Sequence, residues 1–292
     1  MNYNNNGADM TKNYMFWVIL YLIVSLFFAQ EFKKANRNAK DAGALTILLE
    51  LFSAFFACLL IPFFEFKLPS NKSIYLTIFI VTIIYAVTDR LNTEARYGLN
   101  PSTFSMLKQL SSVFLVIFGF IFLKEPFAFK KVFGAIIIIF ANILLAYNNG
   151  KISFNKYFIM CFISNFLFAV AMLINVNISS NFNIAFYTVL TVFIPSIYIF
   201  IFGKYSFKKL SKEFSLYDKP KFILSAFLWS MMLISSVKAY EYGNVSVVAP
   251  LLTLSMITNT IYEYFSNKNK KDFIFKLIIS IVIIIGVILI KV

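Results

Sequence analysis

The sequence predicts an all-α membrane protein, and three observations carry that prediction. Of its 292 residues, 60% are hydrophobic and 37 are Phe, whereas a soluble domain is about 45–50% apolar. Only 14% are charged. Apolar stretches of about 20 residues, the length that crosses a bilayer as a helix, follow one another along almost the whole chain. We therefore expect roughly ten transmembrane helices joined by short connectors, with little room for a soluble domain.

The individual helices are predicted from uncharged length and flanking charge. No charged residue lies between Lys156 and Lys204, and the polar cluster from Asn175 to Asn183 divides that run into two helices. The third helix is expected to end at Asp89-Arg90. The ten helices are expected at roughly 14–30, 43–64, 74–91, 101–123, 131–147, 156–176, 184–202, 221–238, 245–264 and 273–291.

The two halves of the chain resemble each other. A shift of 144 residues superposes the third to fifth helices on the eighth to tenth and aligns polar residues: Asn100 with Asn244, Ser102 with Ser246, and Lys124 with Lys268. We therefore expect two repeats, at 1–148 and 149–292. With five helices in each repeat, the second enters the membrane from the opposite side. Such an inverted repeat is typical of transporters.

The basic residues predict an orientation. Of the 27 Lys and Arg, 18 fall in the loops after the odd-numbered helices and 8 on the other side. The positive-inside rule places the 18 in the cytoplasm and both termini outside, in a multi-pass protein of the cell (plasma or inner) membrane. The polar start, residues 1–13, lacks signal-peptide features, so the first helix is expected to be retained. The net charge of +14 indicates contact with lipid rather than nucleic acid, because no recognition motif is present.

The composition excludes several chemistries. The chain has no His, which removes His-based catalytic triads, His-ligated metals and His proton relays. Cys58 and Cys161 each stand alone in an apolar stretch and predict neither a disulfide nor a zinc site. No phosphate-binding loop for ATP is present. We expect no cofactor, no metal and no enzyme activity.

Three stretches resemble the drug/metabolite transporter superfamily, in its EamA-like branch. They are Tyr97-Gly98-Leu99-Asn100-Pro101-Ser102-Thr103, Leu123-Lys124-Glu125 and the run from Lys238 to Leu251. The resemblance implies ten helices in two five-helix halves. It also implies a midplane cavity lined by helices 1, 3, 4, 6, 8 and 9, which opens to one side at a time. The sequence departs from the family at Glu50, because relatives commonly carry an Arg in helix 2.

Two ionisable residues well inside predicted helices are the first candidates for the site. A charge in the bilayer costs several kcal/mol, so such residues are functional candidates by default. Glu50 could bind a cationic group or carry a proton, or it could be a structural partner of a nearby Lys. Lys108, next to Gln109, could neutralise a carboxylate or phosphate, or it could extend to the lipid headgroups.

Other candidates are polar or aromatic. Tyr85, Asn165 and Asn259 could contact a substrate or simply hydrogen-bond a neighbouring helix. Trp229 could stack on a ligand or belong to the interfacial aromatic belt. Glu94 and Lys238 coincide under the 144-residue shift, so they could act as gates at opposite faces, with Lys238 also touching substrate; the alternative is two ordinary charges at loop edges.

The expected function is secondary transport of a small polar organic metabolite by alternating access. The substrate could be an amino acid, a drug-like cation, a nucleotide-sugar or a phosphorylated metabolite, with coupling to protons or to a counter-substrate. The protein would act as a monomer or homodimer in the lipid bilayer. The alternative is a flippase for a lipid-linked precursor or an accessory membrane subunit. A lateral opening of the cavity to lipid, with basic residues at one rim, would favour the flippase.

Overall fold

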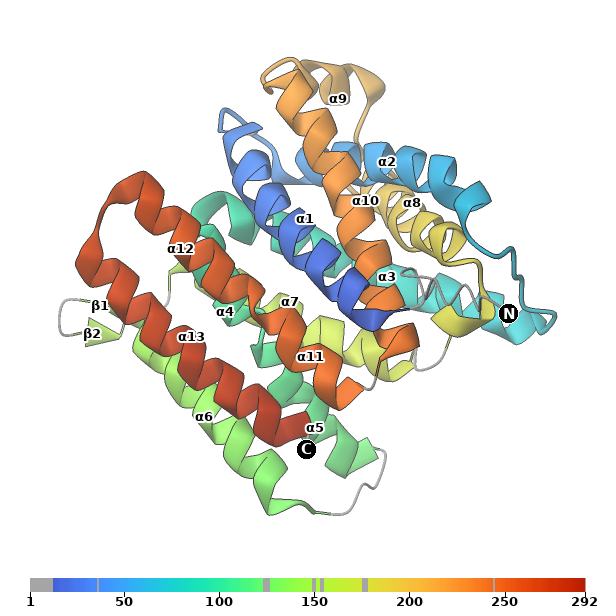
Figure 1. The fold of residues 1–292 in the computed structure, drawn as a ribbon. Coiled ribbons are helices and arrows are strands. Elements are labelled where there is room, and N and C mark those ends of the chain that lie inside the picture. The colour runs from blue at the N-terminus through green and yellow to red at the C-terminus, as the bar shows by residue number, and fades with distance from the viewer. Residues whose placement is uncertain are drawn as a thin grey trace, which may run out of the picture.

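The computed structural model describes residues 13–35, 37–122, 127–148, 151–152, 155–174, 178–243 and 245–291. The fold is almost wholly helical (Figure 1). Its α-helices are α1 (Tyr14–Ala35), α2 (Ala42–Leu60), α3 (Lys72–Gly98), α4 (Pro101–Leu107), α5 (Leu110–Phe122), α6 (Phe129–Ala146), α7 (Lys156–Ile174), α8 (Ile184–Phe202), α9 (Phe207–Phe214), α10 (Lys219–Tyr242), α11 (Val245–Thr253), α12 (Ser255–Asn267) and α13 (Lys270–Lys291).

Short elements connect some of these helices. Two 3₁₀ turns, η2 (Ile61–Phe63) and η3 (Ser179–Asn181), follow α2 and precede α8. The two-residue strands β1 (Tyr147–Asn148) and β2 (Lys151–Ile152) pair antiparallel between α6 and α7.

Eight segments of the described chain are long and apolar enough to cross a membrane, which confirms an all-α membrane protein. They are Tyr14–Ala35, Ala42–Phe63, Lys72–Gly98, Pro101–Phe122, Lys156–Ile174, Ile184–Phe202, Lys219–Tyr242 and Lys270–Lys291. The other two predicted helices correspond in position to α6 and to the α11–α12 pair.

The structure corrects several predicted boundaries. Helix α3 does not end at Asp89-Arg90 but continues to Gly98, and its last turns are held by ring contacts of Arg96 and an ion pair of Glu94. Helix α1 likewise extends past Gln30-Glu31 to Ala35. The predicted fourth helix is broken at Lys108-Gln109 and the ninth at Leu254. Helix α9 was not expected as a separate element.

Some sequence-based expectations lie outside the described residues. They concern the polar N-terminal residues before Asn13, the Leu123-Lys124-Glu125 motif, residues 175–177 of the polar cluster between α7 and α8, and Asn244.

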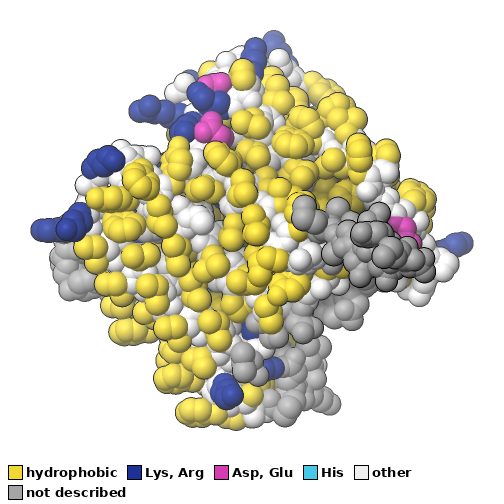
Figure 2. All heavy atoms as spheres, viewed as in Figure 1, with side chains coloured by type: hydrophobic (Ala, Val, Ile, Leu, Met, Phe, Trp, Pro, Cys, Tyr) yellow, Lys and Arg dark blue, Asp and Glu magenta, His cyan; other side chains and the backbone are white. Residues whose placement is uncertain are grey.

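The outside of the helical bundle is apolar. Figure 2 shows hydrophobic side chains across most of the visible face, with Lys and Arg gathered toward its ends. Large apolar side chains such as Phe79, Phe140 and Ile278 are each more than half exposed. An exposed apolar surface of this extent is stable only in contact with lipid.

The helices of the two halves pack against each other in matched pairs. Helix α1 packs along α10, and α3 packs along α7; α2 packs on α8, and α6 on α13 (Figure 1). At the α6–α13 crossing the backbones lie unusually close, since a Cβ on Gly134 would lie 2.5 Å from the Gly286 carbonyl oxygen. Small residues permit such close crossings between membrane helices.

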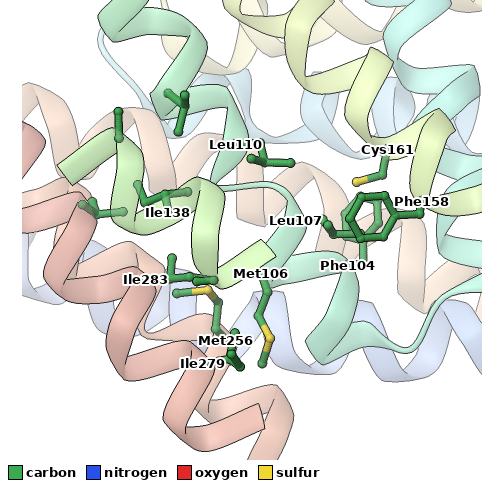
Figure 3. Close-up of a cluster of buried hydrophobic side chains, with 14 of the residues drawn as sticks. Phe104, Met106, Leu107, Leu110, Ile138, Phe158, Cys161, Met256, Ile279 and Ile283 are labelled. Atoms are coloured by element: carbon green, nitrogen blue, oxygen red, sulfur yellow. The ribbon is translucent and has the colours of Figure 1, made fainter. Parts of the chain in front are cut away.

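The core around the break in the fourth helix joins both halves. Figure 3 shows Met106 of α4 close to Met256 of α12 and Ile279 of α13, while Phe104 and Leu107 lie near Phe158 and Cys161 of α7. At the other end of these broken helices, α5 and α11 have at most marginal contact within the described residues. Helices α4 and α12 therefore meet at one end of the bundle and diverge toward the other.

Candidate functional site

A small polar cavity lies where α1, α2, α3 and α10 meet. Its void is about 10 Å³ in this conformation, room for about one water molecule, and polar groups from α2 and α3 face aromatic rings from α1 and α10 across it. The lining residues are Phe28, Thr46, Leu49, Glu50, Asp89, Asn92, Thr93, Arg96 and Trp229. These residues lie on α1, α2, α3 and α10, whereas the resemblance implied a lining from helices 1, 3, 4, 6, 8 and 9.

Glu50 is the most enclosed acidic residue of this cavity. It is 2% exposed, and neither carboxylate oxygen has a hydrogen-bond donor among the described residues. Its nearest charged neighbour is the carboxyl group of Asp89, on the facing helix α3. A buried carboxylate without a donor costs free energy. A structural Lys partner, one of the sequence alternatives for Glu50, is therefore not present within this part of the chain.

Arg96, in the last turns of α3, is held by aromatic rings. Its Cζ atom lies 3.9 Å from the ring centre of Phe104, 5.0 Å from that of Phe28 and 5.5 Å from that of Trp229. Cation–π contacts of this kind stabilise a cation that is removed from water. Trp229 therefore lines the cavity and contacts the guanidinium group of Arg96.

Lys108 lies at the break between α4 and α5. Its Nζ atom is 4.9 Å from the ring centre of Phe168 on α7, and no carboxylate lies within salt-bridge distance among the described residues. Gln109 donates to the Ser105 carbonyl within its own turn, at 3.4 Å. Asn165 of α7 donates to the Leu107 carbonyl oxygen at 2.8 Å. That bond satisfies a carbonyl group which the broken helix frees, as membrane-buried backbone requires.

A second polar cluster joins α4, α12 and α13. It lies at the end of the bundle that carries the 18 Lys and Arg counted above, called the basic end from here on. Both oxygens of Glu263 accept hydrogen bonds from Ser102: Oε1 from the backbone nitrogen at 2.8 Å and Oε2 from the hydroxyl at 2.6 Å. Lys276 Nζ lies 3.0 Å from the same Oε2 and 2.9 Å from Asp272. Glu263 and Lys276 are 7% and 5% exposed. The cluster thus fixes the start of α4 to the second half of the chain.

Asn259 belongs to this end of the bundle and not to the cavity. It accepts a hydrogen bond from Gln30 of α1 at 3.1 Å and donates to Ser105 at 3.4 Å and to its own helix at Ser255. Lys33 of α1 adds bonds to the Leu99 carbonyl at 3.2 Å and to Asn100 at 2.7 Å. Three helices are therefore tied together by polar contacts at this end.

Glu94 and Lys238, the two residues predicted as gates, each form an ion pair with another charged residue. Glu94 forms an ion pair with Lys156 of α7. Lys238 pairs with Glu241 at 2.7 Å and lies 5.6 Å from the Phe64 ring. Neither residue lines the cavity, and Tyr85 does not line it either.

A separate polar cluster around Asp41, at the N-terminal end of α2, binds α9 to that helix. Tyr205 donates to Asp41 at 2.6 Å, and Lys209 lies 2.6 Å from the other oxygen of Asp41. Burial by itself would raise the pKa of Asp41, but the hydrogen bonds from Lys209, Tyr205 and the Ala44 amide outweigh it and lower the pKa to about 2. Burial and the bond to Asp41 raise the pKa of Tyr205 to about 12. Asp41 is also the N-cap of α2.

Sequence reasoning missed two charged residues of the cavity, Asp89 and Arg96, and two of the cluster that joins α4, α12 and α13, Glu263 and Lys276. Each lies near the end of a predicted helix, where a charge is ordinarily solvated. A helical spacing of seven residues places Asp89 and Arg96 on one face of α3, which was the available signal.

Comparisons with known proteins agree with this architecture. A search of curated proteins gives no match to the sequence. A solved structure, titled only as the crystal structure of a protein, aligns over 91% of this chain and 93% of its own, with a TM-score of 0.52 and 10% identity. That likeness concerns the fold alone. The model of the EamA-like transporter family matches residues 15–147. That match covers slightly less than half of the chain, so the first half of the chain is similar to this family.

Proposed function

We propose that the protein is a secondary transporter that moves a small polar organic metabolite by alternating access. The observation that carries this proposal is a pair of helices interrupted by a tight turn in corresponding places, at Lys108-Gln109 and at Leu254, where hydrogen bonds reach three residues back instead of four. Under the 144-residue shift these breaks fall within two residues of each other. Paired discontinuous helices of this kind are associated with the binding sites of transporters built from repeats.

Two five-helix repeats, residues 1–148 and 149–292, are part of the proposal. The same shift superposes the end of α3 at Gly98 on the end of α10 at Tyr242, and the start of α4 on that of α11. Exchanging the halves also converts the α1–α10 pair into the α7–α3 pair, and it leaves the α2–α8 and α6–α13 pairs unchanged. A pseudo-twofold axis that relates the halves accounts for both regularities.

The contact between broken helices supports alternation between two states. Helices α4 and α12 meet at the basic end through Ser102 and Glu263, while α5 and α11 diverge at the other end. We infer that this conformation is closed at the basic end. Rocking of the halves would break that contact and bring α5 and α11 together. Within the cavity, Glu50 would carry a coupling proton and Trp229 would contact substrate.

The proposed setting is the cell (plasma or inner) membrane, with the basic end in the cytoplasm. Ser211, exposed on α9, gives a direct test. In a cysteine-free background, Ser211→Cys should resist an impermeant maleimide in intact cells and react in inside-out vesicles. Labelling in intact cells would reverse the orientation while leaving the transport proposal in place.

Counterflow in proteoliposomes tests the function. Purified protein is first screened by thermal shift against amino acids, organic cations, nucleotide-sugars and sugar phosphates, since a bound ligand stabilises the state that binds it. Stabilising compounds are then loaded inside vesicles and exchanged against labelled compound outside. We expect saturable exchange that protein-free vesicles lack. Binding without exchange, for every compound that stabilises the protein, would contradict the proposal and favour an accessory subunit.

A further inference from the structure

Arg96 is the cavity residue whose chemistry the proposed mechanism leaves unused. It is half-buried at the end of α3 and lines the cavity beside Asp89 and Thr93. Among the described residues it forms neither a hydrogen bond nor an ion pair, and three aromatic rings lie around it. A guanidinium group carries five N–H donors, so a half-buried one without an acceptor is in an unfavourable state unless a ligand supplies one.

The ring contacts determine where those donors are available. Phe104 lies 3.9 Å from the Cζ atom, the distance of a guanidinium stacked over a ring face. Stacking occupies the face of the planar group and leaves its N–H edge free. Phe28 and Phe104, 1% and 2% exposed, are themselves fixed in the core. The rings therefore fix the position of the Arg96 guanidinium group before a ligand binds, which reduces the entropy cost of binding.

The acidic neighbours do not use that edge. The Asp89 and Glu50 carboxyl groups line the same cavity, but neither is within 4 Å of the guanidinium as an ion pair. Lys108 adds a second nearby cation that lacks a carboxylate partner in the described chain and rests instead on Phe168. Arg96 and Lys108 thus lack bonded counter-ions although the carboxyl groups of Asp89 and Glu50 are close, so a ligand carboxylate can still bind at the guanidinium edge.

We propose that Arg96 is the carboxylate-binding residue of this cavity and that the substrate is a small organic carboxylate, a class that rests on the transport function proposed above. A carboxylate accepts two parallel N–H bonds from the edge of a guanidinium, a geometry that Lys does not reproduce. The carboxylate is also singly charged, so it enters a cavity lined by rings at a lower desolvation cost than a doubly charged phosphate.

Trp229 provides the readout, because it touches both Arg96 and the cavity. The chain has two Trp, so Trp17→Phe leaves Trp229 as the only indole. The probes are isosteric carboxylate and amide pairs, from acetate and acetamide up to phenylalanine and its amide, together with methyl phosphate. We expect at least one carboxylate to quench Trp229 saturably and to bind at least about tenfold tighter than its amide, in line with a charge-assisted bidentate pair.

Three variants isolate the guanidinium. Arg96→Gln should abolish the preference for carboxylate over amide. Arg96→Lys, which keeps the charge and is the safer variant for folding, should weaken carboxylate binding at least about tenfold. Arg90→Gln is the matched control: it removes the exposed arginine one and a half turns earlier on α3 and should bind as wild type does.

The outcomes separate this inference from the transport proposal. Carboxylate binding that survives unchanged in both Arg96 variants, tighter binding of methyl phosphate than of every carboxylate, or no carboxylate binding at all would overturn the role of Arg96, even if counterflow succeeds. Arg96-dependent carboxylate binding without counterflow would support the inference and contradict transport.

Discussion

The Glu263 cluster gives a prediction whose size follows from the structure. Glu263→Gln removes the negative charge that faces Lys276 at 3.0 Å but keeps one oxygen, which can still accept from the Ser102 amide. Breaking a buried ion pair costs about 3–5 kcal/mol, because the remaining charge stays buried. Lys276 retains Asp272 at 2.9 Å, so we expect the lower end, about 3 kcal/mol.

This cost applies to the conformation in which α4 and α12 touch. If that contact closes the basic end, about 3 kcal/mol shifts the population toward the state open at that end by about 100-fold. Thr260, 1% exposed and about one turn before Glu263, is the reporter. Introduced into a cysteine-free background, Thr260→Cys should react with a maleimide from the basic side much faster when Glu263→Gln is also present.

A double-mutant cycle with Lys276→Met checks the reasoning. We expect the two substitutions to be coupled by at least about 1 kcal/mol in chemical unfolding, since each removes the other's partner. Lys271→Met, an exposed lysine on the same helix, should change stability by less than about 0.5 kcal/mol. Additive effects of Glu263→Gln and Lys276→Met, with no change in Thr260→Cys labelling, would refute the assigned role of this cluster.

Three further substitutions probe other parts of the molecule. Glu50→Gln should leave exchange of substrate for substrate intact but abolish uptake driven by a pH gradient, because the amide cannot release a proton; unchanged gradient-driven uptake in proteoliposomes would exclude Glu50 as the carrier. Lys108→Ala should abolish counterflow in a protein that still inserts and folds, whereas full activity would reduce Lys108 to its contact with Phe168. Asp41→Asn should change the acid stability. The lowered pKa of Asp41, about 2, means that its contribution is complete above about pH 5 and is lost as the pH falls toward 2. After discounting for solvent screening, that contribution is about 1 kcal/mol. The difference in unfolding stability between wild type and Asp41→Asn should therefore shrink between pH 5 and pH 3, and a constant difference would contradict it.

The sequence was sufficient to predict most helices, because the bilayer imposes a long apolar stretch on each one. The boundaries of α8 and the starts of α1 and α7 agree with the prediction. The end of α3 was wrong, since charge was taken to mark the membrane surface. In the folded protein, aromatic rings from α1, α4 and α10 surround Arg96, so the charge stays within the bundle. Such contacts between distant segments are not visible in local hydropathy.

The break at Lys108-Gln109 was also beyond local reasoning. A run of Ser, Met, Leu and Phe is compatible with a continuous helix, and the stabilising bond comes from Asn165 on another helix. Of the predicted site residues, Glu50 and Trp229 line the cavity, because each stands alone in an apolar helix whose buried face is determined by packing. Gln109, Lys238 and Asn259 instead hydrogen-bond or pair within nearby elements.

The contact between α4 and α12 allows alternating access, the central claim, to be measured directly. In a cysteine-free background, Thr93→Cys reports on the cavity, while Ser102→Cys with Glu263→Cys allows a short bifunctional reagent to lock α4 to α12. Without the lock, an impermeant maleimide should label Thr93→Cys from both faces of the membrane. The lock should stop labelling from the basic side and preserve it from the other. Labelling from the basic side that persists in the locked protein, or a cavity reached from one face only without the lock, would contradict alternating access.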